Sequence, residues 1–236
     1  MALPTLNTAK YELTLPSNGK KIEYRPFLMK EEKVLLMAVE SNDIAAISKA
    51  TRDLVEACTF NKVNIKDLAF FDLEYLFLQL RSKSVGESAG FKLKCKECEA
   101  QNEVHVNLSG IEVRKADKIE NKIMLSDDVG VLMKFPTVGD LEHVMNGIDD
   151  SHGDVAIAIM AAAIESIFDN DSVYPAKDHK PEELIDFIEQ LNKEQFIEIQ
   201  KFFEQIPKVT EDVHFDCNKC GTSNDIKLEG LQDFFG

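Results

Sequence analysis

The sequence predicts an α+β fold: an N-terminal β-hairpin with helices, a split pair of Cys-x-x-Cys hairpins, and a helical domain inserted between that pair. This prediction rests on three observations: alternating apolar and polar residues around turns, apolar residues at helical spacing, and two distant Cys-x-x-Cys motifs. The predicted domain boundaries are 1–85 (hairpin and helices), 86–110 (first Cys hairpin), 111–208 (inserted strands and helices) and 209–236 (second Cys hairpin and tail).

Composition limits the classes of protein and partner to consider. A chain of 236 residues can bury a sizeable core, and 44% hydrophobic with 29% charged residues is typical of a soluble globular protein. The formal net charge of -15 argues against nucleic acid as a ligand, because phosphate-binding surfaces need clustered Lys and Arg. We also expect no membrane span and no signal peptide, and hence a cytosolic protein where it is made.

The N-terminal region predicts a hairpin followed by helices. Residues 11–15 and 21–25 alternate apolar and polar side chains around the turn sequence Pro16-Ser17-Asn18-Gly19. Helical periodicity begins at Met29 and returns between Asp43 and Cys58. Residues 64–83 form the strongest apolar segment, which we expect to be the buried central helix of this region.

The inserted region predicts two short strands and then a series of helices. The strands cover 122–125 and 130–135, and Asp127-Asp128 lies in the turn between them. The predicted helices cover 138–147, 154–168, 181–191 and 193–205. Capping signals support two of these starts, at Thr137 and at Asn192 with Gln195.

Each Cys-x-x-Cys motif lies at the tip of a predicted β-hairpin, Cys95 and Cys98 in the first, Cys217 and Cys220 in the second. After each motif the chain repeats a pattern at an offset of 122, so that 102–106 corresponds to 224–228. Two such hairpins can supply four thiolates to one tetrahedral zinc ion, at about 2.3 Å each. The prediction is therefore a structural Zn(Cys)4 site, with zinc shared between two chains as the alternative.

Apart from these four cysteines, the sequence predicts no catalytic or metal-binding residues. Cys58 ends a helical pattern and is expected in the core, while His105 and His214 are expected on strand surfaces. Acidic pairs at 127–128, 149–150 and 169–171 fall in predicted turns. The usual motifs of hydrolases, metalloproteases, nucleotide-binding loops and deaminases do not occur in the sequence, so we predict no catalytic residues and no enzyme.

The segment from Leu15 to Phe27, continuing into 30–38, resembles the opening of the baseplate hub assembly proteins of T4-type contractile-tailed bacteriophages. That family has the same order of a hairpin with a Pro-Ser-x-Gly turn, an Arg-Pro-Phe sequence and a Glu-Glu-Lys helix. Chain length and the alternation of helices with a cysteine-bearing middle are also similar. The zinc site is not part of this resemblance.

The resemblance implies a non-enzymatic viral tail-assembly factor that helps build the central hub of the baseplate, either as a chaperone or as a hub component. Its implied partners are the phage hub and tape-measure proteins, and its implied location is the host cytoplasm during assembly and, for a component, the virion tail. Two alternatives remain: a zinc-ribbon adaptor in transcription or nucleic-acid machinery, and an enzyme of thiol–disulfide exchange.

Overall fold

The computed structural model describes residues 7–111, 113–114, 119–147 and 155–234. The chain divides into two compact units. The first contains the described residues up to Ile65, then Phe71–Arg114, and those from Lys208 on; the second contains Lys66–Phe70 and the described residues between Lys115 and Pro207. The four-part division predicted from the sequence is finer and stays a prediction.

The first unit opens with the predicted hairpin. Strand β1 (Tyr11–Thr14) pairs antiparallel with β2 (Lys21–Tyr24), and Gly19 takes a φ of 72° in the turn between them. The alternation has the expected effect, because Leu13, Ile22 and Tyr24 are buried. In the turn, Ser17 donates hydrogen bonds from its backbone N–H and its hydroxyl to the buried carboxylate of Asp72.

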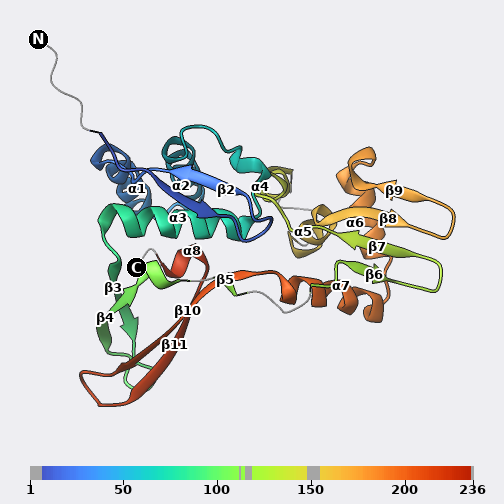
Figure 1. Cartoon of the computed structure of the whole chain (residues 1–236). Helices are drawn as coiled ribbons and strands as arrows, with labels where there is room; N and C mark the ends of the chain where they lie inside the picture. The colour runs from blue at the N-terminus through green and yellow to red at the C-terminus, as the bar shows by residue number, and fades with distance from the viewer. Residues whose placement is uncertain (1–6, 112, 115–118, 148–154, 235–236) are drawn as a thin grey trace, which may run out of the picture. The chain divides into compact units, whose positions relative to one another are not determined.

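Three helices follow, and the third forms the predicted core of this unit. They are α1 (Met29–Glu40), α2 (Ile44–Cys58) and α3 (Phe70–Val85), with a short 3-10 turn η1 (Ile65–Asp67) before α3 (Figure 1). Asp43 caps α2 by accepting a hydrogen bond from the N–H of Ala45. In α3, the side chains of Leu76, Phe77 and Leu80 are fully buried.

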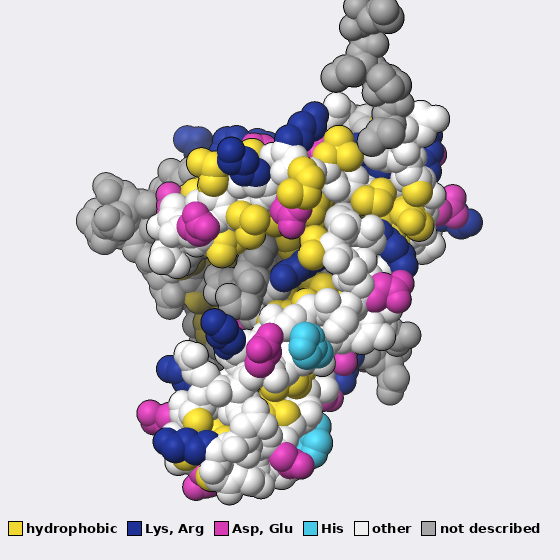
Figure 2. Space-filling view, turned by 90° about the vertical axis from the view of Figure 1, so that its left-hand side faces the viewer, with side chains coloured by type: hydrophobic (Ala, Val, Ile, Leu, Met, Phe, Trp, Pro, Cys, Tyr) yellow, Lys and Arg dark blue, Asp and Glu magenta, His cyan; other side chains and the backbone are white. Residues whose placement is uncertain are grey.

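Helix α1 buries only one side. Leu35 and Ala38 face inward, whereas four apolar side chains are more than half exposed: Met29 (78%), Val34 (56%), Leu36 (54%) and Met37 (60%). The space-filling view that faces this end of the unit shows hydrophobic side chains interspersed with Lys and Arg (Figure 2). We call the four exposed residues Met29, Val34, Leu36 and Met37 the α1 face.

The two Cys hairpins complete the first unit. Strand β3 (Ser88–Lys94) pairs antiparallel with β4 (Gln101–Asn107), which is followed by η2 (Leu108–Gly110). The longer β10 (Lys208–Asp216) lies between β11 (Ser223–Glu229) and the short β5 (Val113–Arg114). Helix α8 (Gly230–Asp233) then lies between α3 and β10, and it brings Phe234 into the core (Figure 1).

The second unit combines a four-stranded antiparallel sheet with helices. The strand order is β6 (Lys122–Met124), β7 (Gly130–Met133), β8 (Ile164–Phe168) and β9 (Val173–Pro175). Its helical segments are α4 (Val138–Gly147), α5 (Val155–Ala162), η3 (Ala176–Asp178), α6 (Pro181–Glu189) and α7 (Lys193–Gln205). The core contains Val131, Met133, Ile164, Ile188 and Phe202. As predicted, Asn192 and Gln195 form a capping box at the start of α7.

The predicted helix over 154–168 is wrong in its second half. Within the described residues, α5 ends at Ala162 and the chain becomes strand β8, in which Ile164 and Ser166 are buried and Glu165 is exposed. A short apolar segment is compatible with a buried helix or a buried strand, so periodicity alone did not separate them. The second unit therefore has a four-stranded sheet where the sequence predicted only two strands followed by helices. None of the described helices is long and apolar enough to cross a membrane.

Candidate metal centre

Both Cys-x-x-Cys motifs lie in hairpin turns of the same shape. In the first turn, the N–H of Cys95 donates to the carbonyl of Ala100 at 2.9 Å, and in the second the N–H of Cys217 donates to Thr222 at 2.9 Å. A residue with positive φ follows each second cysteine, Glu99 at 54° and Gly221 at 75°. The sequence repeat at an offset of 122 is therefore a repeat of structure.

The four sulfurs gather in one cluster within the first unit. Cys95 Sγ lies 3.7 Å from Cys220 Sγ, and Cys98 Sγ lies 3.6 Å from Cys217 Sγ. All four sulfurs lie within 4.8 Å of one another, and all four cysteines are free thiols rather than disulfides. A tetrahedron of sulfurs at about 2.3 Å from a zinc ion has edges of about 3.8 Å, so the cluster fits such an ion.

Hydrogen bonding favours thiolates at two of the four positions. The N–H groups of Cys220 and Lys219 lower the pKa of Cys217 to about 6. The N–H groups of Cys98 and Glu97 likewise lower the pKa of Cys95.

A third thiol resists ionisation beside its neighbours. At Cys98 the N–H of Ala100 favours the thiolate, but Cys220, burial, Cys217 and Cys95 outweigh it and raise the pKa to about 12. Four thiols this close cannot all ionise without a cation to balance them. The cluster is chemically suited to a divalent metal that accepts thiolate ligands.

Two buried asparagines connect the hairpins beside the sulfurs. Asn102 on β4 and Asn224 on β11 are 2% and 0% exposed, and they are equivalent in the repeat. Each amide lies against the sulfur of a cysteine in the opposite hairpin, Cys217 for Asn102 and Cys95 for Asn224. Sequence reasoning aligned the two asparagines but assigned them no role; their equivalence beside the two motifs was the available signal.

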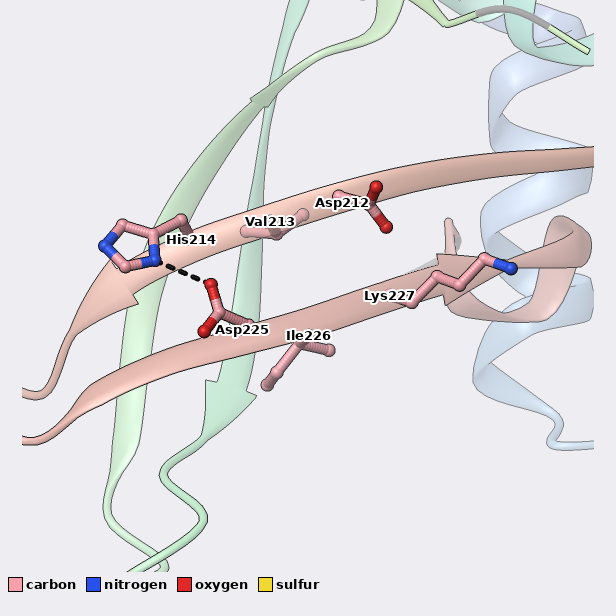
Figure 3. A pocket seen from close by; sticks show the side chains of 6 residues that line it. All are labelled: Asp212, Val213, His214, Asp225, Ile226 and Lys227. Atoms are coloured by element: carbon pink, nitrogen blue, oxygen red, sulfur yellow. Dashed lines mark hydrogen bonds and ion pairs between the residues drawn. The ribbon is translucent and has the colours of Figure 1, made fainter. Parts of the chain in front are cut away.

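The two histidines lie on strand surfaces, as predicted. His105 is exposed on β4. His214 Nδ1 lies 2.8 Å from Asp225 Oδ1 on the outer surface of the β10–β11 hairpin (Figure 3), and this pairing raises the pKa of His214. The shallow depression there is lined by Asp212, Val213, His214, Asp225, Ile226 and Lys227.

Cys58 is a core residue, as predicted. Its side chain is fully buried, and burial raises its pKa to about 12, which disfavours the reactive thiolate form. Two of the three acidic pairs lie in turns that are held by side-chain to backbone hydrogen bonds. The carboxylate of Asp169 accepts from the N–H groups of Asp171 and Ser172, and the N–H of Asp128 donates to Ser126 Oγ. The pair at 149–150 lies outside the described residues.

Comparison with known proteins defines the class of the chain. The profile of the family "T4 bacteriophage base plate protein" matches residues 8–236. The chain therefore belongs to this family of phage baseplate proteins, as the N-terminal resemblance implied. No curated protein and no solved structure matched it significantly.

Proposed function

We propose that the protein is a non-enzymatic tail-assembly factor that helps build the central hub of the baseplate, as a chaperone or as a hub component. The observation that carries this proposal is the family match over residues 8–236, which gives the chain a structural or assembly role in the baseplate. Its partners in this proposal are hub and tape-measure proteins. It acts in the host cytoplasm during assembly and, as a component, stays in the virion tail.

The α1 face supports a role in binding other proteins. Exposed apolar patches on folded proteins mark interaction sites, and methionine adapts its shape to a partner surface. Met29 and Met37 are 78% and 60% exposed on one helix, with Leu36 close by. We propose that this face binds the apolar surface of a hub or tape-measure protein.

We further propose that Cys95, Cys98, Cys217 and Cys220 bind one structural zinc ion. The geometry of the four sulfurs supports this role, because it matches the tetrahedron that zinc prefers and leaves no open ligand position. The ion would join two hairpins that are separated by the 118 residues between Cys98 and Cys217. In this role the metal stabilises the fold that presents the α1 face.

Co-expression with the hub and tape-measure proteins, followed by affinity capture, tests the proposal. We expect capture of at least one of them, and at least a tenfold loss of capture for Met37→Lys. Met145→Lys is the matched control, because Met145 is 68% exposed on α4 in the second unit. Failure to capture any of these proteins would overturn the proposal, and equal loss in both variants would remove α1 as the binding face. Presence of the chain in purified virions would identify a component rather than a chaperone.

A further inference from the structure

We propose that Asn102 and Asn224 are positioning residues of the metal centre, each reaching from its own hairpin to fix a sulfur and the turn of the other. The inference deepens the proposed zinc site and rests on it. It assigns the docking of the two hairpins to a reciprocal pair of side-chain amides as well as to the ion.

The contacts of the two amides are the same in kind and nearly the same in length. Asn102 Oδ1 accepts from the N–H of Asn218 at 2.8 Å, while its Nδ2 donates to its own turn at Ala100 O (2.9 Å) and lies 3.7 Å from Cys217 Sγ. Each asparagine therefore engages its own turn and the opposite turn together.

The second amide repeats these contacts in the opposite direction. Asn224 Oδ1 accepts from the N–H of Lys96 at 2.9 Å, and its Nδ2 donates to Thr222 O at 2.7 Å and lies 3.6 Å from Cys95 Sγ. The two sets are related by exchange of the hairpins. Two amide bridges therefore cross from hairpin to hairpin, one beside the sulfur of Cys217 and one beside that of Cys95.

Burial shows that these amides do more than fill space. A buried amide is costly unless its polar atoms are hydrogen-bonded, and here both the oxygen and the nitrogen have partners. Leucine would fill the volume but leave the N–H of Asn218 or Lys96 without an acceptor. Aspartate would keep that acceptor but lose the donor to sulfur, and it would place a carboxylate beside thiolates. Only a side chain with both functions suits the position.

The chemical consequence concerns Cys95 and Cys217, the first cysteines of the two motifs. Metal ligands are generally oriented by the groups that hydrogen-bond to them, and loss of such a group typically lowers metal affinity about 10–100-fold. An amide donor to a metal-bound sulfur also withdraws electron density from it. Removing the donor is therefore expected to change both the affinity and the sulfur-to-metal charge-transfer absorption.

Cobalt(II) titration of the full-length chain tests the proposal, with zinc affinity then measured by competition against a chromogenic chelator. We expect Asn102→Asp and Asn224→Asp each to weaken binding at least tenfold and to shift the charge-transfer band. Both variants keep the acceptor for the backbone N–H of the opposite turn, but they lose the amide donor to sulfur and to their own turn and place a carboxylate beside the thiolates. Asn107→Asp is the control and is expected to bind within twofold of wild type, because Asn107 is exposed and caps η2 through its oxygen alone.

The outcomes separate the two proposals. Wild-type protein that binds no cobalt would overturn the metal site, whereas wild-type affinity and spectrum in both Asp variants would overturn only the positioning role. If the variants fail to fold, hydrogen exchange in the zinc-loaded wild type decides: the side-chain amide protons of Asn102 and Asn224 are expected to exchange far more slowly than those of Asn107. Equally fast exchange at all three would overturn the inference.

Discussion

Arg25, in the Arg-Pro-Phe sequence, joins two segments of the first unit. Its guanidinium forms a bidentate pair with Glu31, at 2.7 and 2.9 Å, and both side chains are largely buried, at 14% and 13% exposed. Arg25 also donates to the carbonyl of Pro26, and Glu31 accepts from the N–H of Leu28. The Arg-Pro-Phe sequence and the Glu-Glu-Lys helix that carry the resemblance are thus joined in the fold.

Glu31→Gln tests this pair through its pH dependence. The hydrogen bond from Arg25 lowers the pKa of Glu31 below its ordinary value of 4.5. A carboxylate with a lowered pKa stabilises the fold above its unfolded pKa and loses that contribution as pH falls through the folded pKa. We expect Glu31→Gln to lower the free energy of unfolding by about 2 kcal/mol at pH 7. The deficit should shrink as the pH falls below about 4.5 in denaturation followed by circular dichroism. In this range the unfolded wild-type chain binds a proton at Glu31, whereas the folded chain, in which the pKa of Glu31 is lowered, does so only at lower pH.

Glu40→Gln is the control for that variant, since Glu40 is exposed at the end of α1. It should change the free energy of unfolding by less than about 0.5 kcal/mol. A deficit for Glu31→Gln that stays constant from pH 7 to pH 3 would contradict the assigned role of the ion pair.

The left-handed position in each Cys turn gives a second test at the residue scale. Glu99 has a φ of 54° where the equivalent Gly221 has 75°, and no atom lies within 4 Å of a Cβ added at Gly221. Both positions have a left-handed backbone, which glycine adopts more easily than other residues. The effect of a substitution at either position should therefore come from this backbone preference. We expect Glu99→Gly to raise the free energy of unfolding by up to about 1 kcal/mol and Gly221→Ala to lower it by about 1 kcal/mol. A lower free energy of unfolding for Glu99→Gly, or a higher one for Gly221→Ala, in thermal unfolding of the zinc-loaded protein would refute the equivalence of the two turns.

At the scale of elements, the C-terminal segment closes the core of the first unit. Phe234 is fully buried and meets the ring of Phe91 edge to face, with centroids 6.2 Å apart. The guanidinium of Arg81 donates to the carbonyl of Phe234, so α3 holds the end of α8 in place. The next residue, Phe235, lies outside the described residues.

Phe234→Ala is expected to lower the free energy of unfolding of the first unit by about 3–5 kcal/mol, because it leaves a cavity beside Phe91. Val85→Ala, at a side chain that is 60% exposed at the end of α3, should change it by less than about 0.5 kcal/mol. Denaturant titration of the two variants compares them directly. Similar midpoints would show that α8 does not contribute to the core.

The sequence predicted those turns, helix caps and hairpins that depend on residues close together along the chain. The turn at Gly19, the caps at Thr137 and Asn192, and the Cys-x-x-Cys hairpins all follow from residues within a few positions of one another. Strand β8 was missed because its apolar residues also suit a helix and because β7, one of its two partner strands, lies far back along the chain. Leu132 of β7 pairs with Ser166, while Gly130 leaves room for the ring of Phe168. The contacts of Asn102 and Asn224 were missed for the same reason, because they form only when two distant hairpins meet.

At the scale of the whole molecule, the five cysteines of this baseplate-family protein should differ in thiol reactivity. Four of them form the cluster, and the fifth, Cys58, is buried in the core. After chelation, four thiols are expected to react rapidly with Ellman's reagent, while Cys58 reacts only on unfolding because it is fully buried. In the metal-loaded protein none should react rapidly. Fast reaction in that state would favour the alternative of thiol–disulfide exchange.

We propose that each chain closes one structural metal site with its own four cysteines. Elemental analysis of protein purified without added metal, combined with its mass in solution by light scattering, tests this claim. We expect one zinc per chain in wild-type protein, and loss of that zinc in Cys95→Ser. A wild-type chain without zinc, or one zinc for every two chains in a dimer, would contradict the claim.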